Sequence, residues 1–231
     1  MPESIQNRLE RVNDRIKQAA LSSGRDPKTV KLVAVSKTVP LDRIQAGIKA
    51  GLTDLGENYV QEAREKIEAL AGKNVSWHFI GHLQSNKAKY AVKLFDLIHS
   101  VDSFKLAKEL DRRAGALGKV QPILIQVNIS GEETKSGIEA EKALALVRET
   151  APLENLAVRG LMTMPPYFNA PDKVRPYFRA LRSLQGLIRE EAIPNVEMTE
   201  LSMGMTGDFE TAIEEGATLV RIGTAIFGER A

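Results

Sequence analysis

Lys37 is the residue of this sequence that is best placed for covalent chemistry. It follows the apolar, β-branched run LVAVS at 32–36, which is typical of a buried strand. Side chains alternate between the two faces of a strand, so Val33, Val35 and Lys37 share one face. At the mouth of a barrel, partial desolvation would favour the neutral amine, which attacks an aldehyde to form a Schiff base. A lysine that is solvated at the end of a strand is the alternative interpretation.

The segment LVRIGTAIFG at 219–228 has residue types that suit a phosphate site. Arg221 lies in a β-type run, Gly223 permits close approach of the backbone, and Thr224 offers a hydroxyl beside exposed N–H groups. Ser202 offers a second hydroxyl at the end of the preceding predicted strand. Barrels frequently bind phosphate after strands seven and eight, and the eighth strand of a closed barrel lies beside the first. An ordinary tight turn is the alternative, but the expected proximity to Lys37 strengthens the phosphate hypothesis.

Other kinds of chemistry find no support in the sequence. The absence of cysteine excludes disulfides, thiolate nucleophiles and cysteine-based metal sites. His78 and His82 are four residues apart, which on a strand separates them by roughly 13 Å, too far to share a metal ion. We therefore predict no metal site, and expect His78 to be buried or hydrogen-bonded. There is also no G-x-S-x-G elbow and no Walker-type phosphate loop.

Short apolar runs alternate with longer charged segments of helical period, and these elements must position the reactive groups. The expected strands lie at 32–36, 53–56, 76–81, 97–101, 122–129, 158–164, 197–203 and 218–223. The expected helices lie at 41–50, 58–70, 86–93, 103–116, 139–149, 172–191 and 208–215. The predicted N-caps are Asp42, Ser103 and Asp208. The glycines expected to end helices are Gly51, Gly118 and Gly216.

Eight strands separated by helices predict a fold of the α/β class. Parallel strands joined by helical crossovers fit this alternation, and eight such units close a barrel. We therefore predict a single (β/α)8 TIM-type barrel over residues 1–231. An extra N-terminal helix at 3–23 is expected to pack on it, with an apolar stripe that includes Leu9, Val12 and Ile16. A doubly wound open sheet is the alternative, but no Gly-rich dinucleotide fingerprint follows 32–36.

Composition narrows the range of partners and locations. The 231 residues include 32 Lys and Arg against 30 Asp and Glu, and only 5% are aromatic. Without a basic cluster, nucleic acid is not expected as a partner. No signal peptide is visible, and no apolar run approaches the roughly 20 residues that span a bilayer. The expectation is a soluble cytoplasmic protein that does not bind membranes.

Seven segments together resemble the YggS/PROSC family, the pyridoxal phosphate homeostasis proteins. They are AVSKTVP (34–40), LGENYVQEA (55–63), WHFIGHLQSNK (77–87), VNISGEETKSG (127–137), RGLMTM (159–164), LSMGMTGDFETAI (201–213) and VRIGTAIFG (220–228). The resemblance extends essentially from end to end. It implies a barrel similar to the N-terminal domain of bacterial alanine racemase.

The resemblance also implies a cofactor, pyridoxal 5'-phosphate (PLP), bound to Lys37 as a Schiff base. Arg221 would face the pyridine nitrogen of the cofactor. Because a guanidinium stays protonated, it would disfavour a proton on that nitrogen and weaken the ring as an electron sink. The other implied contacts are Ser202, Gly223 and Thr224 at the phosphate, and Asn58, His82 and Met203 around the ring.

Two functions follow from this resemblance. The first is a non-catalytic carrier or regulator that stores, buffers or delivers PLP, with apo-PLP enzymes as its partners. The second is an amino-acid racemase or another PLP-dependent enzyme; racemisation needs a second acid–base group such as a tyrosine from a further domain. The chain ends at Ala231 without such a domain, and neither Tyr59 nor Tyr167 lies in a motif that supports this role. We therefore favour the carrier.

A class I aldolase is a third possibility, because it also forms a Schiff base on a barrel lysine. Its imine forms with substrate, so the purified protein would be colourless, whereas bound PLP absorbs visible light. We expect a monomer, with a dimer as the alternative. The loop 131–137 is expected to be solvated.

Overall fold

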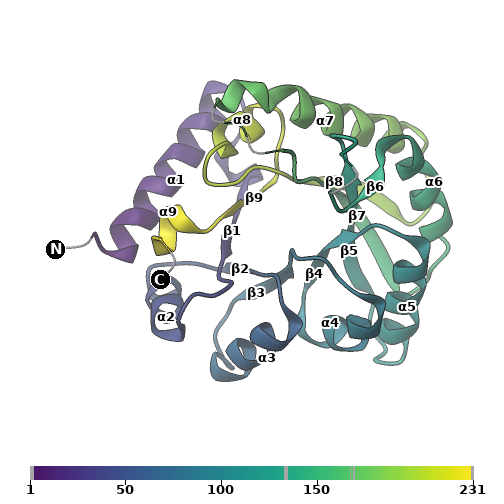
Figure 1. Cartoon of the computed structure of the whole chain (residues 1–231), viewed down its shortest axis with the longest axis horizontal. Helices are drawn as coiled ribbons and strands as arrows, with labels where there is room; N and C mark the ends of the chain where they lie inside the picture. Colours follow the sequence, from purple (N-terminus) through teal and green to yellow (C-terminus); the bar gives the residue numbers. More distant parts are fainter. Residues whose placement is uncertain (1–2, 133–134, 167, 169, 230–231) are drawn as a thin grey trace.

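The computed structural model describes residues 3–132, 135–166, 168 and 170–229, and within them eight parallel strands close into a barrel (Figure 1). The strands are β1 (Lys31–Val35), β2 (Asp54–Glu57), β3 (Ser76–Phe79), β4 (Leu97–Val101), β5 (Gln121–Asn128), β7 (Leu156–Met162), β8 (Val196–Ser202) and β9 (Leu219–Ile222). β1 pairs with both β2 and β9, and β4 pairs with β5, so the sheet has no open edge. The predicted (β/α)8 barrel is confirmed.

One short strand was not predicted. β6 (Ile138–Glu139) has two residues and pairs with the end of β5, outside the closed barrel. Several strand boundaries also differ from the expected ones by one or two residues. The first strand ends at Val35 rather than at position 36, so Lys37 lies in the turn beyond the strand.

Helices follow the strands and form the outer layer of the barrel (Figure 1). They are α2 (Leu41–Lys49), α3 (Val60–Ala69), α4 (Ala88–Leu94), α5 (Phe104–Gly115), α6 (Ala140–Thr150), α7 (Arg175–Glu190), α8 (Phe209–Glu214) and α9 (Thr224–Phe227). The helix expected at the N-terminus is α1 (Ile5–Ser22), which packs against α8 and α9. Its buried stripe includes Leu9, Val12 and Ile16, as the sequence pattern predicted.

The hydrophobic core lies mainly between the barrel and its helices, where the apolar faces of both meet. A separate small cluster of Val33, Leu124, Met162 and Leu219 is fully buried among the strands. Each of these residues comes from a different strand, as expected for a packed barrel interior. The other interior side chains that are described below are polar.

The helix ends agree only partly with the predicted caps. Ser103 is the N-cap of α5, and its hydroxyl accepts a backbone hydrogen bond as predicted. Asp42 was predicted wrongly, because Pro40 takes the N-cap position of α2 and Asp42 lies in the first turn. Asp208 is the N-cap of α8 but makes no cap bond; its carboxylate accepts instead from the Met205 N–H. The three predicted stop glycines follow helices with positive φ angles: Gly51, Gly118 and Gly216.

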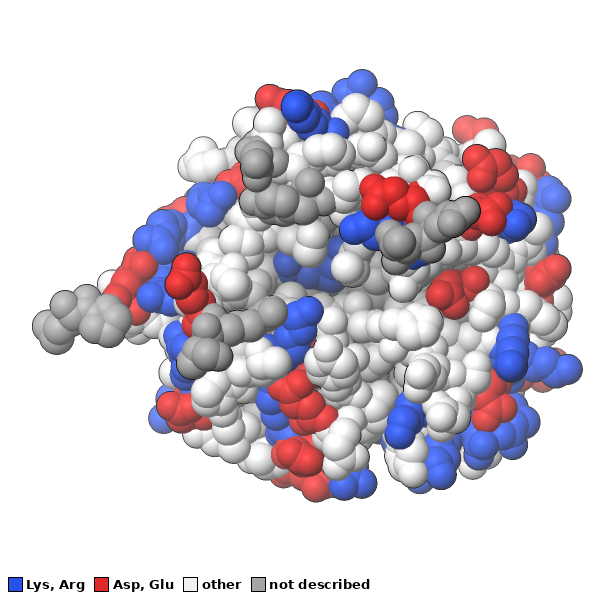
Figure 2. Space-filling view, in the orientation of Figure 1, with Lys and Arg blue, Asp and Glu red and all other residues white. Residues whose placement is uncertain are grey.

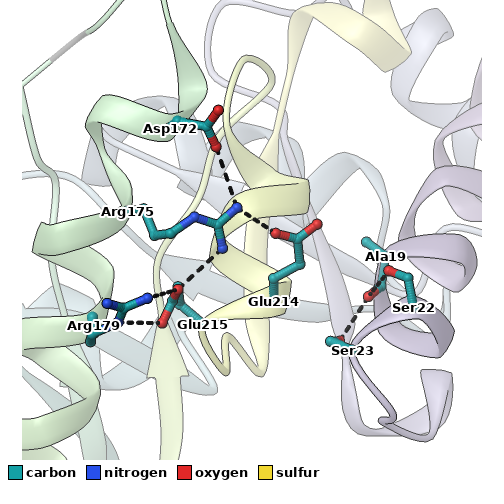
Figure 3. Close-up of polar contacts among 8 residues, drawn as sticks. All are labelled: Ala19, Ser22, Ser23, Asp172, Arg175, Arg179, Glu214 and Glu215. Atoms are coloured by element: carbon teal, nitrogen blue, oxygen red, sulfur yellow. Dashed lines mark hydrogen bonds and ion pairs between the residues drawn. The ribbon is translucent and has the colours of Figure 1, made fainter.

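An ion-pair cluster joins α7 to the end of α8 in the outer layer (Figure 3). Arg175 on α7 contacts Glu214 at 2.6 Å and Glu215 at 3.1 Å, at the end of α8. Arg179 binds the same Glu215 at 3.0 Å. Figure 3 also shows the end of α1, where the hydroxyls of Ser22 and Ser23 donate to the Ala19 carbonyl. The arginine contacts connect α7 to α8, the helix that directly precedes β9.

No helix in the described part of the chain is both long enough and apolar enough to cross a membrane.

Candidate functional site

A cavity of about 290 Å³ lies at the carboxyl-terminal end of the strands. Functional groups of barrel proteins collect at this end, because the loops there converge on the barrel axis. Five of the predicted site residues line the cavity: Lys37, Asn58, Arg221, Gly223 and Thr224. Figure 2 shows basic atoms near the centre of the face viewed down the barrel, with mostly uncharged residues around them. The site is therefore a pocket that contains basic groups and is surrounded mostly by uncharged residues.

Lys37 lies in a tight turn directly after β1. The Val39 N–H donates to the Ser36 carbonyl at 3.0 Å, which places Lys37 and Thr38 at the two central positions. Thr38 has a φ of 60°, a left-handed conformation that β-branched residues rarely adopt. Such strain costs on the order of 1–3 kcal/mol and persists only where the surroundings impose it. The half-buried Lys37 thus has a fixed backbone position.

A buried ion pair imposes this turn. Lys66 on α3 donates to the Ser36 carbonyl at 2.5 Å, to Glu57 at 2.8 Å and to Glu62 at 2.6 Å. Glu62 also accepts the Thr38 N–H at 2.5 Å, so both neighbours of Lys37 are held. Burial raises the pKa of the fully buried Glu57, against hydrogen bonds from Lys66 and Ser36.

The contacts of Lys66 beneath the turn were not predicted from the sequence. The spacing of four between Glu62 and Lys66 on a predicted helix was the available signal. No local pattern predicted that Glu57, the last residue of the short strand β2, would be buried beside them.

Arg221 on β9 is 3% exposed and lies at the base of the cavity. Its guanidinium donates to the Ser202 hydroxyl and, at 2.8 Å, to the Thr163 carbonyl. Burial lowers the pKa of Arg221 to about 10, against the attraction of Asp208. The group therefore stays a cation at neutral pH, and it is a fixed hydrogen-bond donor beside the cavity.

Hydroxyl and amide groups complete the polar part of the lining. Thr224 and Thr206 lie with their hydroxyl oxygens 3.3 Å apart, next to Gly223. Thr206 was not predicted as a site residue, although it belongs to the segment 201–213. The Asn58 side-chain oxygen is buried, and it has no hydrogen-bond partner among the described residues. An unpaired buried oxygen is costly, so this site suits a ligand that supplies a donor.

Gly81 brings the end of β3 against Asn58. A Cβ atom at Gly81 would lie only 2.3 Å from the Asn58 carbonyl oxygen, so no larger residue fits without displacing the backbone. This close approach sets the position of Asn58 at the cavity wall.

The other three predicted site residues lie outside the cavity lining. Ser202 is fully buried below it, in contact with Arg221. His82 is exposed and lines two neighbouring depressions, both shared with Asn58. Met203 is fully buried in the hydrophobic core. Met164 and Met205 line the cavity instead, from the loops after β7 and β8.

The barrel interior holds a hydrogen-bonded series that the sequence reasoning did not foresee. We call Asp54, His78, His99, Ser202 and Arg221 the interior network. His78 lies 3.1 Å from the Asp54 carboxylate and 2.9 Å from His99, and His99 lies 2.8 Å from the Ser202 hydroxyl. The expectation that His78 is buried or hydrogen-bonded is confirmed. Among the described residues, no group of three or more His, Cys, Asp or Glu side chains could hold a metal ion.

Comparison with known proteins agrees with this fold. Residues 8–231 match the family model "Alanine racemase, N-terminal domain". A protein of Aquifex aeolicus named "Pyridoxal phosphate homeostasis protein" is 51% identical over 96% of this chain and 97% of its own length. The Escherichia coli protein of the same name is 42% identical, over 98% of this chain and 97% of its own.

Solved structures give the same result. PipY of Synechococcus elongatus, in a structure with PLP bound, is 37% identical with a TM-score of 0.83, over 97% of this chain and all of its own. An alanine racemase of Clostridium difficile has a TM-score of 0.70 at 16% identity, over 95% of this chain and 56% of its own. The racemase likeness shows only a shared fold. With these relatives along its full length, the chain belongs to the family of pyridoxal phosphate homeostasis proteins.

Proposed function

We propose that this protein binds pyridoxal 5'-phosphate in the cavity at the carboxyl end of the barrel, through a Schiff base to Lys37. The observation that carries the proposal is the meeting of three groups on one cavity. These groups are an amine in a fixed turn, a buried guanidinium, and paired hydroxyls beside a glycine. They correspond to the aldehyde, ring nitrogen and phosphate of PLP. The PLP-bound relative PipY supports this assignment.

In this proposal each residue of the lining has a separate task. Arg221 donates to the ring nitrogen, while Gly223, Thr224 and Thr206 hold the phosphate. Asn58 accepts a hydrogen bond from the ligand through its unpaired oxygen. Ser202 as a phosphate ligand, and His82 and Met203 as ring contacts, stay predictions. The contact that Ser202 makes here is with Arg221.

We further propose that the protein is a carrier or regulator of PLP and does no chemistry of its own. PLP can stabilise carbanions because its ring accepts electrons, most strongly when the ring nitrogen is protonated. A buried guanidinium at that nitrogen disfavours this proton. Among the described cavity residues there is also no tyrosine, since Tyr59 is 61% exposed and lines a neighbouring depression. Tyr167, the other candidate acid–base group, lies outside the described residues.

The biological role follows from the same reasoning. As a carrier, the protein would store, buffer or deliver PLP in the cytoplasm, with apo-PLP enzymes as recipients and a monomer as the working unit. The single barrel over residues 1–231 would be that unit. Transfer of PLP from the loaded protein to an apo-enzyme, compared with release into buffer, measures this role.

Replacement of Lys37 tests the cofactor assignment. Lys37→Ala is expected to abolish the visible absorption band of bound PLP, because no Schiff base can form at that position. Lys87→Ala is the matched control: Lys87 lies in the neighbouring depression but not on the cavity, and its variant is expected to keep the band. A band of undiminished intensity in Lys37→Ala would refute the assignment.

Isotope exchange separates the carrier from an enzyme. The loaded protein is incubated in deuterium oxide with L- or D-alanine, and exchange at Cα is followed by NMR. A carrier is expected to show little exchange beyond the rate that free PLP gives under the same conditions. Rapid exchange would support the racemase instead.

A further inference from the structure

The interior network joins two ends of the barrel. Arg221 lines the proposed PLP cavity at the carboxyl end. Asp54, at the start of β2, lines a separate cavity of about 330 Å³ that also contains Lys31 and Lys17. Between them, His78, His99 and Ser202 are at most 4% exposed. A continuous line of hydrogen bonds therefore crosses a water-poor interior from one cavity to the other.

The donors in this line all point the same way. A guanidinium can only donate, so Ser202 accepts from Arg221, and this leaves the hydroxyl proton of Ser202 available for Nδ1 of His99. With Nδ1 accepting, a neutral His99 carries its proton on Nε2 and donates it to Nδ1 of His78. His78 then donates from Nε2 to the Asp54 carboxylate.

The reverse direction requires an additional charge or proton. If His99 donated from Nδ1 to Ser202, it would accept from His78, and Asp54 would then face either a doubly protonated His78 or carry a proton itself. The first arrangement is the one that keeps both imidazole rings neutral and Asp54 ionised. Burial lowers the pKa of His99 well below its ordinary value, helped by His78 and Arg221. Burial alone would raise the pKa of Asp54, but hydrogen bonds from His78 and Thr53 and the charge of Lys31 hold it below the ordinary value.

We infer that the interior network is a positioning device, in which Asp54, His78 and His99 hold Arg221 in place and couple the charge of Asp54 to the cofactor ring. The inference rests on the proposed function, which sets the ring nitrogen against Arg221. Hydrogen bonds in series polarise one another in a low-dielectric interior. The negative charge of Asp54 therefore strengthens each acceptor along the line as far as the Ser202 hydroxyl, which holds the Arg221 guanidinium more firmly beside the cofactor. A change of charge at the cavity lined by Asp54 would therefore alter the affinity for PLP.

The first experiment tests the direction of the line without any cofactor. The chain has only three histidines, so 15N NMR spectra of the PLP-free protein resolve each ring. At neutral pH, His78 and His99 are expected as neutral Nε2–H tautomers, and the exposed His82 serves as the reference. An Nδ1–H tautomer on His99, or a doubly protonated His78, would overturn the inference.

The second experiment measures the coupling in the PLP-loaded protein. Asp54→Asn keeps the shape of the side chain and removes its charge, and PLP release is followed by loss of the visible band. Release is expected to be about twofold to thirtyfold faster than in wild type, the range for residues that act through a network. The pH at which the visible band changes should also move. Asp54→Glu is expected to restore both quantities towards wild type, because it restores the charge.

Asp96→Asn is the control, since it removes an exposed carboxylate at the same end of the barrel but outside the network. Its release rate and its band should equal those of wild type. If Asp54→Asn and Asp96→Asn both behave as wild type while Lys37→Ala has lost the band, the coupling is refuted and the proposed function stands. If Lys37→Ala retains the band, the proposed function itself fails.

Discussion

Single buried groups determine much of how this site is built. Lys66 is the clearest example, because one ammonium group donates to Glu57, Glu62 and the carbonyl before Lys37. Exposed ion pairs contribute little to stability, whereas loss of one partner from a buried pair leaves an uncompensated charge. The two kinds of pair occur on the same helix, which allows a direct comparison.

Lys66→Met is expected to lower the free energy of unfolding by about 3–5 kcal/mol, because Glu57 would remain buried without its partner. Urea unfolding of the purified protein measures this change. Arg64→Met removes an exposed pair with Glu68 from the same helix and should cost less than about 1 kcal/mol. If the two substitutions lower the free energy of unfolding equally, the buried pair of Lys66 and Glu57 contributes no more to stability than an exposed pair.

His99 gives the stability of the protein a predictable dependence on pH. Its pKa is lowered in the folded state by burial, then by His78 and Arg221, whereas in the unfolded chain it is near 6.5. The unfolded state therefore binds the proton more readily. As the pH falls below about 6.5, the free energy of unfolding should decrease by up to about 1.4 kcal/mol per pH unit from this group.

Unfolding curves at pH 7 and pH 5 check this prediction. In His99→Gln the contribution of His99 to the slope between these values is lost, so the variant should depend less steeply on pH. His82→Gln, which changes an exposed ring, should keep the wild-type slope. A His99→Gln protein with the full wild-type slope would assign the pH dependence to other groups.

At the scale of whole elements, the position of α8 matters because it leads into β9, the strand of Arg221. Arg175 and Arg179 tie α7 to the end of α8 through Glu215, whose side chain is only 8% exposed. Burial alone would raise the pKa of Glu215, but hydrogen bonds from both arginines hold it below its ordinary value. The cluster therefore links two helices and stabilises the ionised carboxylate between them.

Arg175→Met is expected to reduce the free energy of unfolding by more than the roughly 1 kcal/mol of an exposed pair, because a largely buried Glu215 loses one of its two arginines. Chemical denaturation gives the value. Arg148→Met is the comparison, since it breaks a pair with Glu191 in which both side chains are exposed. If the two variants unfold at the same denaturant concentration, the link between α7 and α8 contributes nothing beyond a surface contact.

At the scale of the whole molecule, the folded barrel alone assembles the proposed PLP site. The contributing residues come from the ends of β1 and β9 and from the segments that follow β1, β2, β3, β7, β8 and β9, so the unfolded chain has no equivalent site. A ligand that binds only the folded state stabilises it by mass action. PLP at about one hundred times its dissociation constant should add about 2.7 kcal/mol.

Thermal unfolding with and without PLP tests this linkage. The midpoint of wild type is expected to rise with PLP concentration, whereas the midpoint of Lys37→Ala should rise much less. The variant without PLP should unfold close to the wild type without PLP, which separates loss of binding from loss of stability. A midpoint of wild type that ignores PLP would contradict binding at this site.

The sequence by itself determined the elements of this protein and predicted several of the residues that line the cavity. Apolar runs with a period of two and helices with a period of 3.6 are local properties, so eight strands and a closed barrel followed from them. Lys37, Arg221, Gly223 and Thr224 were predicted because the ends of barrel strands meet at one face. Helix caps were predicted less reliably: Asp42 is not the N-cap of α2, because Pro40 takes that position.

Only the tertiary structure decided which side chains meet inside the barrel. His99 and Ser202 are 103 positions apart, and no pattern in the sequence pairs them. Their contact depends on strand register and on which face of each strand turns inward, and a shift of one residue reverses that face. Beyond the end of β8, the course of the loop likewise decides that Met203 lies in the core while Met205 lines the cavity. Local periodicity identifies the strands, but the closed barrel selects the partners of each side chain.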